Sequence, residues 1–255
     1  MMLLRQYFRD IWWIALGYLL ILEAAMIAAI MFWPQFRDNV PAIAKVVPFQ
    51  ALQDLISQMH QAGFWPYFAV QHWFKGCSLF GVAAIAFMGS GIIAREADQR
   101  TAEFLLSRPI SRRRVLLSRF FVLSMATIVP VYLTSITAIW ISVNVEEFMG
   151  WGDILLAATY MSCFLLMLCG LCTLLSTMST NQFRAGTILI GFVLANFAIY
   201  LVQSIDTFSL FKTIDIWAFM QIHAGEPPWS LGAIFVAVTA VELILADWIF
   251  RRRTF

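Results

Sequence analysis

Six long apolar stretches constrain this chain more than any other feature of its sequence. They cover about residues 11–33, 73–94, 120–143, 154–176, 185–204 and 230–250. A helix needs about 20 apolar residues to cross the hydrocarbon core of a bilayer, and each stretch reaches that length. Backbone polar groups inside lipid must be satisfied within the segment, which favours helices. We therefore predict an all-α polytopic membrane protein with six transmembrane helices, forming a single membrane domain over residues 1–255.

The composition excludes several other classes of protein. Hydrophobic residues make up 61% of the chain and charged residues 13%, against about 45–50% and about 25% in soluble domains. A water-soluble enzyme, a disordered chain and a disulfide scaffold are all inconsistent with these values. The net charge of +2 gives no reason to expect a nucleic-acid partner. The first apolar stretch is too long for the core of a signal peptide, so we expect it to be retained as a span.

Basic residues predict the orientation of the spans. With the N-terminus inside, thirteen of the 17 lysine and arginine residues lie on the inner side. The other four are Arg37, Lys45, Lys75 and Lys212. Inner loops of membrane proteins carry such an excess of positive charge. We therefore predict that both the N-terminus and the C-terminus are cytoplasmic.

Three segments outside the predicted spans have a distinct composition. The N-terminal Met1–Asp10 mixes apolar residues with arginines, so it is either a short amphipathic helix on the inner surface or a basic flank that only sets topology. The outer loop 34–72 is divided by four prolines. Within it, residues 52–61 have the periodicity of an amphipathic helix, and 64–74 is an aromatic-rich stretch typical of the membrane interface. A second outer segment covers 205–229.

The inner loop 95–119 is the most informative of these segments. Its centre reads R-T-A-E-F-L-L-S-R-P-I-S-R over residues 100–112. Thr101 can cap a short helix that ends before Pro109, and Ser111 can cap the next helix. Three adjacent apolar residues in a charged loop need a surface to bury against, either the headgroup layer or another protein. They are Phe104, Leu105 and Leu106.

This loop resembles that of the integral-membrane permease subunits of type-2 ABC exporters. In that family a threonine, a glutamate, two leucines, a proline and a basic residue recur at this place, although Arg100 stands here where a glycine is common. The six-span layout and the N-terminal segment also match. The long first outer loop resembles the branch that includes permeases of nitrous-oxide-reductase maturation.

The resemblance implies a mechanism and a set of partners. It implies a dimer of permeases in a prokaryotic inner membrane, homodimeric or pseudo-symmetric, with each copy docking one separate ATPase, and it leaves room for a periplasmic partner. The residues expected to dock the ATPase are Glu103, Phe104, Leu105 and Leu106, with Arg108 and Arg112 near the rim. The G-x-x-x-x-G-K-[ST] loop does not occur in residues 1–255. We therefore expect no catalytic residue or cofactor in this chain, with ATP and Mg²⁺ bound by the ATPase.

A few polar residues inside the spans are candidates for a substrate pathway. Glu23 and Glu242 lie midway along the first and sixth spans, where an ionisable side chain is costly. Each either lines a pathway or hydrogen-bonds to a neighbouring helix. Asn196 has the same two alternatives. Asp247 lies four residues before Arg251, which predicts an ion pair along the helix.

Cys169 and Cys172 share one face of the fourth span. Thiolates are ligands for soft metals such as Cu(I), so this pair is a weak metal candidate. Small, soft residues are also common in helix packing, which is the simpler interpretation. Gly89 and Gly91 are expected to allow two helices to approach closely.

Three alternative functions remain to be compared with an exporter. An intramembrane hydrolase is disfavoured because His60, His72 and His223 all fall in predicted outer loops. A channel or secondary transporter usually has discontinuous helices or a polar midplane site, whereas these spans are nearly uniformly apolar. A permease that transmits force to a periplasmic partner without passing a substrate stays open. The sequence does not identify a substrate.

Overall fold

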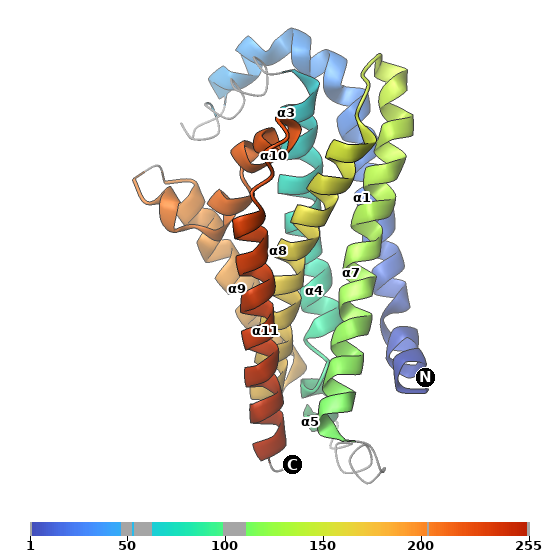
Figure 1. Ribbon diagram of the computed structural model, residues 1–255, viewed down its shortest axis with the longest axis vertical. Helices are drawn as coiled ribbons and strands as arrows, with labels where there is room; N and C mark the ends of the chain where they lie inside the picture. The colour runs from blue at the N-terminus through green and yellow to red at the C-terminus, as the bar shows by residue number, and fades with distance from the viewer. Residues whose placement is uncertain (1, 47–52, 54–62, 99–110, 203, 254–255) are drawn as a thin grey trace.

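A computed structural model describes residues 2–46, 53, 63–98, 111–202 and 204–253, and every regular element in these ranges is helical. Five of these helices are long and apolar enough to cross a membrane. They are α1 (Met2–Val46), α7 (Arg112–Ser142), α8 (Trp151–Met178), α9 (Gln182–Tyr200) and α11 (Trp229–Arg252). The long helices are arranged along a common axis (Figure 1). The prediction of an all-helical membrane fold is confirmed.

The predicted second span forms a helical run of three consecutive pieces. These are α3 (Phe64–Phe68), η1 (Ala69–Phe80) and α4 (Gly81–Gly89). The middle piece is a π-helix, in which the hydrogen bonds join residues five apart. The run therefore contains no single α-helix of spanning length. The part of the chain described here has five such helices rather than the six predicted.

Helix α8 is the centre of the bundle and packs against α4, α7, α9 and α11. Glycines allow some of these close approaches. A Cβ atom on Gly89 of α4 would lie 2.8 Å from Leu123 Cδ2 and 2.9 Å from Cys172 Sγ. Distances below 3 Å are steric clashes, so a larger residue at this position would displace the side chains of Leu123 and Cys172. The predicted close approach at Gly89 is confirmed.

Helix α1 continues well beyond the predicted end of the first span. It passes through Pro34 and Pro41 and ends at Val46, so the prediction that a loop begins at 34 is wrong. Aromatic packing explains the extension, because Trp33 and Phe36 are buried and lie 4.9 and 4.7 Å, centroid to centroid, from the ring of Tyr67. The predicted amphipathic helix at 52–61 falls on residues outside the described ranges, apart from Gln53.

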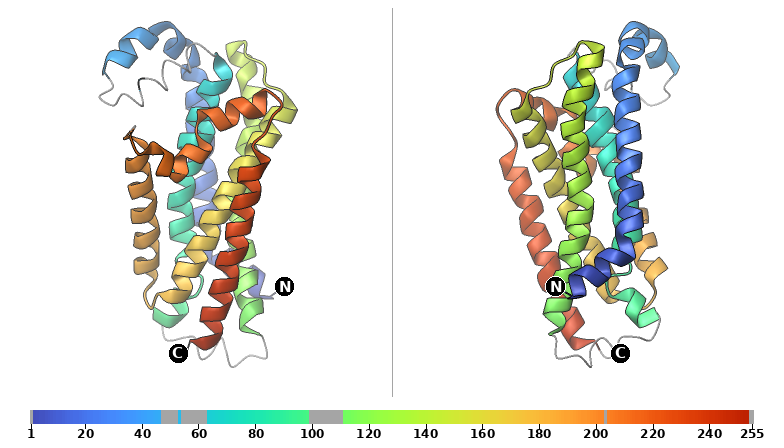
Figure 2. Two further views of the ribbon diagram at one scale, coloured as in Figure 1. Left: turned by 60° about the vertical axis from the view of Figure 1, so that its left-hand side comes forward. Right: turned by 90° about the vertical axis from the view of Figure 1, so that its right-hand side faces the viewer.

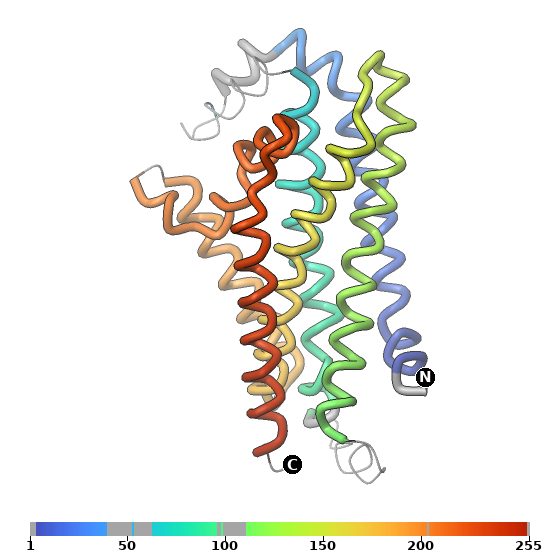
Figure 3. Tube along the Cα trace, viewed as in Figure 1, coloured from blue at the N-terminus to red at the C-terminus, as the bar shows by residue number. Residues whose placement is uncertain are grey.

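Both chain termini lie at the same end of the bundle, which we call the terminal end (Figures 1 and 2). The first turns of α1 cross this end at an angle to the bundle axis (Figure 2). The beginning of α7 and α5 (Ala94–Asp98) lie at the terminal end as well (Figure 3).

Short helices cover the opposite end of the bundle. They are η2 (Val143–Val145), η3 (Asp206–Phe208), η4 (Leu210–Ile214) and α10 (Ile216–His223). The aromatic stretch 64–74 packs against α10, and its six Phe, Tyr and Trp side chains are buried. These rings therefore face the inside of the bundle, and the position of the stretch at the membrane interface stays a prediction.

Candidate functional site

The residues predicted to dock an ATPase fall mainly between α5 and α7. Glu103, Phe104, Leu105, Leu106 and Arg108 lie outside the described ranges. The structure does describe how the chain is held immediately before and after them. We call the two sets of contacts, one before and one after residues 99–110, the anchors. The candidate site consists of these two anchors.

The anchor before residues 99–110 is a turn that leads from α4 into α5. The hydroxyl of Ser176, buried on α8, donates to the carbonyl of Ser90 at 2.8 Å. The same oxygen accepts hydrogen bonds from the backbone N–H groups of Ile93 at 3.0 Å and Ala94 at 3.1 Å. Helix ends leave such backbone groups without intrahelical partners. One serine of α8 therefore satisfies three of them.

Two further helices hold the same turn. The buried guanidinium of Arg119 on α7 donates to the carbonyl of Ile92, and it lies 5.6 Å from the ring centroid of Tyr7 on α1. The hydroxyl of Tyr7 donates to the carbonyl of Met88 at 2.6 Å. The turn before residues 99–110 is thus fixed to α1, α7 and α8 together.

The anchor after residues 99–110 joins the beginning of α7 to the end of α11. The hydroxyl of Ser111 accepts a hydrogen bond from the N–H of Arg114 at 3.3 Å, which confirms the predicted cap. Arg112 Nη1 donates to the carbonyls of Phe250 at 2.8 Å and Arg253 at 2.7 Å. The predicted rim residue Arg112 therefore also binds the C-terminal turn of its own chain.

The two anchors converge on the last turn of α8. Arg253 Nη1 donates to the carbonyl of Thr177 at 2.6 Å, next in sequence to Ser176. The path before the loop reaches α8 through Ser176, and the path after it reaches α8 through Arg112, Arg253 and Thr177. The segments before and after residues 99–110 are therefore both hydrogen-bonded to the same helix turn, the second through Arg112 and Arg253.

The two intramembrane glutamates both face neighbouring helices. Thr137 of α7 donates to Glu23 Oε1 at 3.1 Å. Glu242 of α11 lies against Gly170 of α8, where any side chain would collide with the carboxyl. The Oε2 atom of each glutamate is buried without a hydrogen-bond partner among the described residues. Unpaired buried polar atoms are costly, so both positions stay candidates for a role in transport.

Asn196 is engaged in joining two parts of the chain. Its Oδ1 accepts a hydrogen bond from the N–H of Leu210 at 3.3 Å, and its backbone carbonyl accepts one from Ser209 at 2.7 Å. These contacts agree with the hydrogen-bonding alternative, and a pathway role stays a prediction. The predicted ion pair between Asp247 and Arg251 is present at 2.7 Å.

The two cysteines of the weak metal candidate contact different helices. Cys169 Sγ lies 3.8 Å from Thr127 Oγ1 of α7, whereas Cys172 Sγ lies 3.5 Å from the carbonyl of Ile85 of α4. No group of three or more histidine, cysteine or acidic side chains suited to a metal occurs among the residues described. The structure thus brings no third ligand to this pair.

The prediction that His72 lies in an outer loop is wrong. It lies inside η1 and is buried, with Nε2 3.2 Å from Ser135 Oγ and 3.4 Å from Thr134 Oγ1. Trp73 Nε1 also donates to Ser135 Oγ, at 3.2 Å. The predicted span began one residue after His72, so the argument from loop histidines against a hydrolase does not hold for it. The aromatic residues before His72 signalled that the helix begins earlier.

The opposite end is held chiefly by rings. Trp65 Nε1 donates to the carbonyl of Phe219 at 3.0 Å, and the rings of Trp73 and Phe219 stack at 5.1 Å. The ring of His223 stacks on Trp65 at 4.9 Å, and its Nδ1 lies 2.7 Å from Asp153 Oδ2. These contacts attach α10 to both α3 and α8.

An ion-pair cluster supports the second outer segment. Lys212 Nζ lies 2.9 Å from Asp206 and 3.4 Å from Asp215. Partial burial lowers the pKa of Lys212, but the two carboxylates outweigh it and raise the pKa above its ordinary value. Asp215 also caps α10 through the N–H of Ile216 at 2.6 Å. The segment is therefore a folded part of the protein.

Comparison with known families gives one result. The model of a family described as "ABC-2 family transporter protein" matches residues 4–254. A search of curated proteins finds no match. The matched residues include the helices described above, apart from residues 2–3 of α1, and the inner loop 95–119.

Proposed function

The chain belongs to the ABC-2 family of transporter proteins, a family of multi-pass membrane permeases, and from this premise we propose that it couples ATP hydrolysis by a separate ATPase to export. The coupling loop 95–119 docks that ATPase. The convergence of both loop anchors on the last turn of α8 carries this proposal. Hydrogen bonds with α1, α8 and the end of α11 hold the segments on both sides of the loop, which supports a role for the loop in moving the bundle.

The proposal assigns six crossings and cytoplasmic termini. Both termini lie at the terminal end, which an even number of crossings produces and five do not. The run Phe64–Gly89 supplies the sixth, because about 26 helical residues span well over 30 Å even with a π-helical middle. Most arginines lie in segments at the terminal end, which supports a cytoplasmic position for it.

The assembly proposed is a dimer of permeases with two ATPase copies in a prokaryotic inner membrane. ATP and Mg²⁺ bind the ATPase, since residues 1–255 contain no phosphate-binding loop motif. ATP-driven closure favours one arrangement of the loop over another, and this differential contact is what drives the bundle. In this chain, Phe104, Leu105 and Leu106 make the contact that couples the permease to the ATPase.

The test is a double substitution in the coupling loop, Phe104→Glu with Leu105→Glu. Two carboxylates in an apolar contact should weaken ATPase binding by about tenfold or more, while membrane insertion stays normal. The measurement is co-purification of the ATPase in mild detergent. The matched control is Phe148→Glu, since Phe148 is 84% exposed at the opposite end. If the double variant retains its ATPase as well as the control does, the loop is not the docking element.

Glu23 and Glu242 are assigned to the transport step. Both lie where α1 and α11 pack on central helices, with one carboxyl oxygen each left without a partner in the described structure. Glu23→Gln keeps the size of the side chain and its hydrogen bond with Thr137. We expect it to alter transport more than assembly. Unchanged transport would return Glu23 to a packing role.

A permease that transmits force to a periplasmic partner is the second candidate. The folded cap at the opposite end favours it, because Phe148 and Phe208 are 84% and 81% exposed there. Replacing both with serine while ATPase activity persists separates the two functions. Loss of partner binding with normal substrate export would favour an exporter that also has a periplasmic contact, and loss of all function would favour force transmission.

A further inference from the structure

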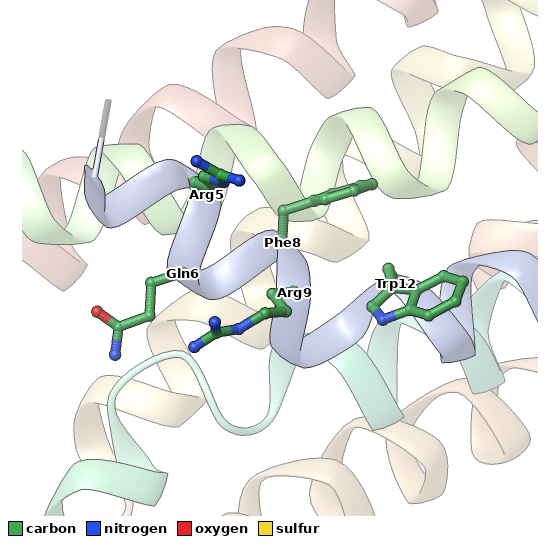
Figure 4. Close-up of a pocket in the computed structure, with 5 residues that line it drawn as sticks. All are labelled: Arg5, Gln6, Phe8, Arg9 and Trp12. Carbon is green, nitrogen blue, oxygen red and sulfur yellow. The ribbon is translucent and has the colours of Figure 1, made fainter.

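The first turns of α1 carry an open hollow that the proposed function does not use. It has a volume of about 560 Å³. Five residues line it: Arg5, Gln6, Phe8, Arg9 and Trp12 (Figure 4). All five come from the part of α1 that crosses the terminal end of the bundle (Figure 2).

The opposite side of this helix is fixed to the bundle. Tyr7 and Ile11 are buried, and the hydroxyl of Tyr7 holds the carbonyl of Met88. Residues three or four apart share a face of a helix, so Arg5, Phe8 and Arg9 point away from the buried side together. The orientation of the hollow is therefore set by packing and does not depend on the residues that line it.

The hollow is positively charged and apolar at once. No carboxylate pairs with Arg5 or Arg9 in the described part of the chain, and the nearby Asp10 lies 3.9 Å from Arg95. Two like charges four residues apart oppose each other on a helix. A bound anion would remove that repulsion. Phe8 is 53% exposed beside the arginines, so the site also offers apolar surface.

We propose that this hollow binds the phosphate of an anionic phospholipid in the leaflet next to the terminal end. Guanidinium groups bind phosphate oxygens in a planar, two-point geometry, which suits Arg5 and Arg9. The rings of Phe8 and Trp12 lie against the first carbons of the acyl chains, and tryptophan prefers the headgroup layer. Two arginines without a carboxylate partner among the residues that the structure describes select a net anionic headgroup over a zwitterionic one. The site requires only that this end meets a membrane surface, so it does not depend on the ATPase.

The test uses the full chain in nanodiscs of phosphatidylcholine containing a minority of phosphatidylglycerol. Native mass spectrometry measures how many phosphatidylglycerol molecules stay bound as collision energy rises. Arg5→Gln with Arg9→Gln should lower retention about tenfold or more. Arg113→Gln with Arg114→Gln removes the same charge from exposed arginines of α7 and should retain the lipid. Equal losses in both variants would mean that only net charge matters, and the proposal would fail.

Further measurements identify which ligand the site binds and show whether a variant has lost the site or its fold. Arg5→Lys with Arg9→Lys keeps the charge without the planar geometry, and we expect intermediate retention. Inorganic phosphate that displaces the lipid completely would show a free-anion site and overturn the lipid assignment. Loss of a co-purifying ATPase with unchanged lipid retention would also overturn it, because the arginines would then contact protein.

Discussion

The two ends of the bundle are held together by different chemistry. At the terminal end, side-chain donors from Ser176, Arg112, Arg119 and Arg253 bind backbone carbonyls of distant segments. At the opposite end, aromatic rings pack against one another, with Trp73 buried at the centre. Directional bonds occur at the opposite end too, such as that from Trp65 Nε1 to the carbonyl of Phe219, but there they are accompanied by extensive ring packing.

The difference bears on which end can move. Ring packing sums many small dispersion contacts, so a small displacement costs a little of each. A hydrogen bond to a buried carbonyl is either made or lost, and losing it leaves the carbonyl unpaired. Truncating a buried ring should therefore lower global stability more than removing one hydrogen-bonding side chain, whose effect should stay local. Four substitutions test this distinction.

The largest effect on stability is expected from Trp73→Ala at the opposite end. Trp73 is fully buried, stacks on Phe219 and bonds Ser135, so its truncation leaves a large cavity. We expect a loss of about 3–5 kcal/mol in the free energy of unfolding. Denaturant unfolding in detergent measures it. The control Trp140→Ala removes a ring that is 70% exposed, and similar losses from both variants would contradict the proposed role of the ring cluster.

Ser176→Ala should act locally at the terminal end. It leaves two N–H groups and one carbonyl unpaired, which costs about 2–3 kcal/mol. We expect faster proteolysis within the coupling loop 95–119 and a smaller change in global unfolding than Trp73→Ala gives. Ser162→Ala is the matched control, because in the described part of the chain that buried hydroxyl bonds to Ala158 of its own helix and to no other segment. Unchanged proteolysis would show that Ser176 does not hold the loop.

Arg112→Lys should separate coupling from stability. A lysine cannot reproduce the contacts of the guanidinium with the carbonyls of Phe250 and Arg253, so we expect a loss of about 1–2 kcal/mol. ATPase binding should persist while transport per ATP hydrolysed falls. Reconstituted vesicles measure both quantities. Arg113→Lys, at an exposed neighbour, should leave the ratio unchanged, and an equal fall in both variants would count against the anchor.

The smallest effect is expected from the hydrogen-bonded contact between His223 and Asp153 at the opposite end. Both side chains are partly exposed, and such pairs contribute less than about 1 kcal/mol. A double-mutant cycle with His223→Gln and Asp153→Asn measures their coupling in unfolding experiments. A coupling several times larger would mean that polar contacts, and not only rings, fix this end.

Local patterns in the chain account for much of what was predicted. Apolar length identified each helix of the bundle, because the bilayer sets a minimum length that any spanning helix must meet. The cap at Ser111 and the pair of Asp247 with Arg251 were also predictable, since both join residues within one helical turn. The charge bias predicted cytoplasmic termini in the same way, from the composition of each loop alone.

The remaining features join residues far apart in the chain, and periodicity carries no information about them. Trp33 and Phe36 hold α1 together past Pro34 only because Tyr67 lies beside them. His72 is buried because α7 presents Ser135 to it. The mixed helical run at 64–89 could not be inferred from its apolar character either.

The candidate site also has some features that local sequence predicts and others that depend on tertiary contacts. The amino-acid sequence by itself identified the apolar residues of the coupling loop and the family they resemble, because those residues are adjacent. Only the tertiary structure brought the ends of that loop to Ser176 and Thr177, through bonds between residues about 80 to 140 positions apart. Such contacts depend on how helices pack, since each donor must meet an acceptor on a distant segment that no local pattern specifies.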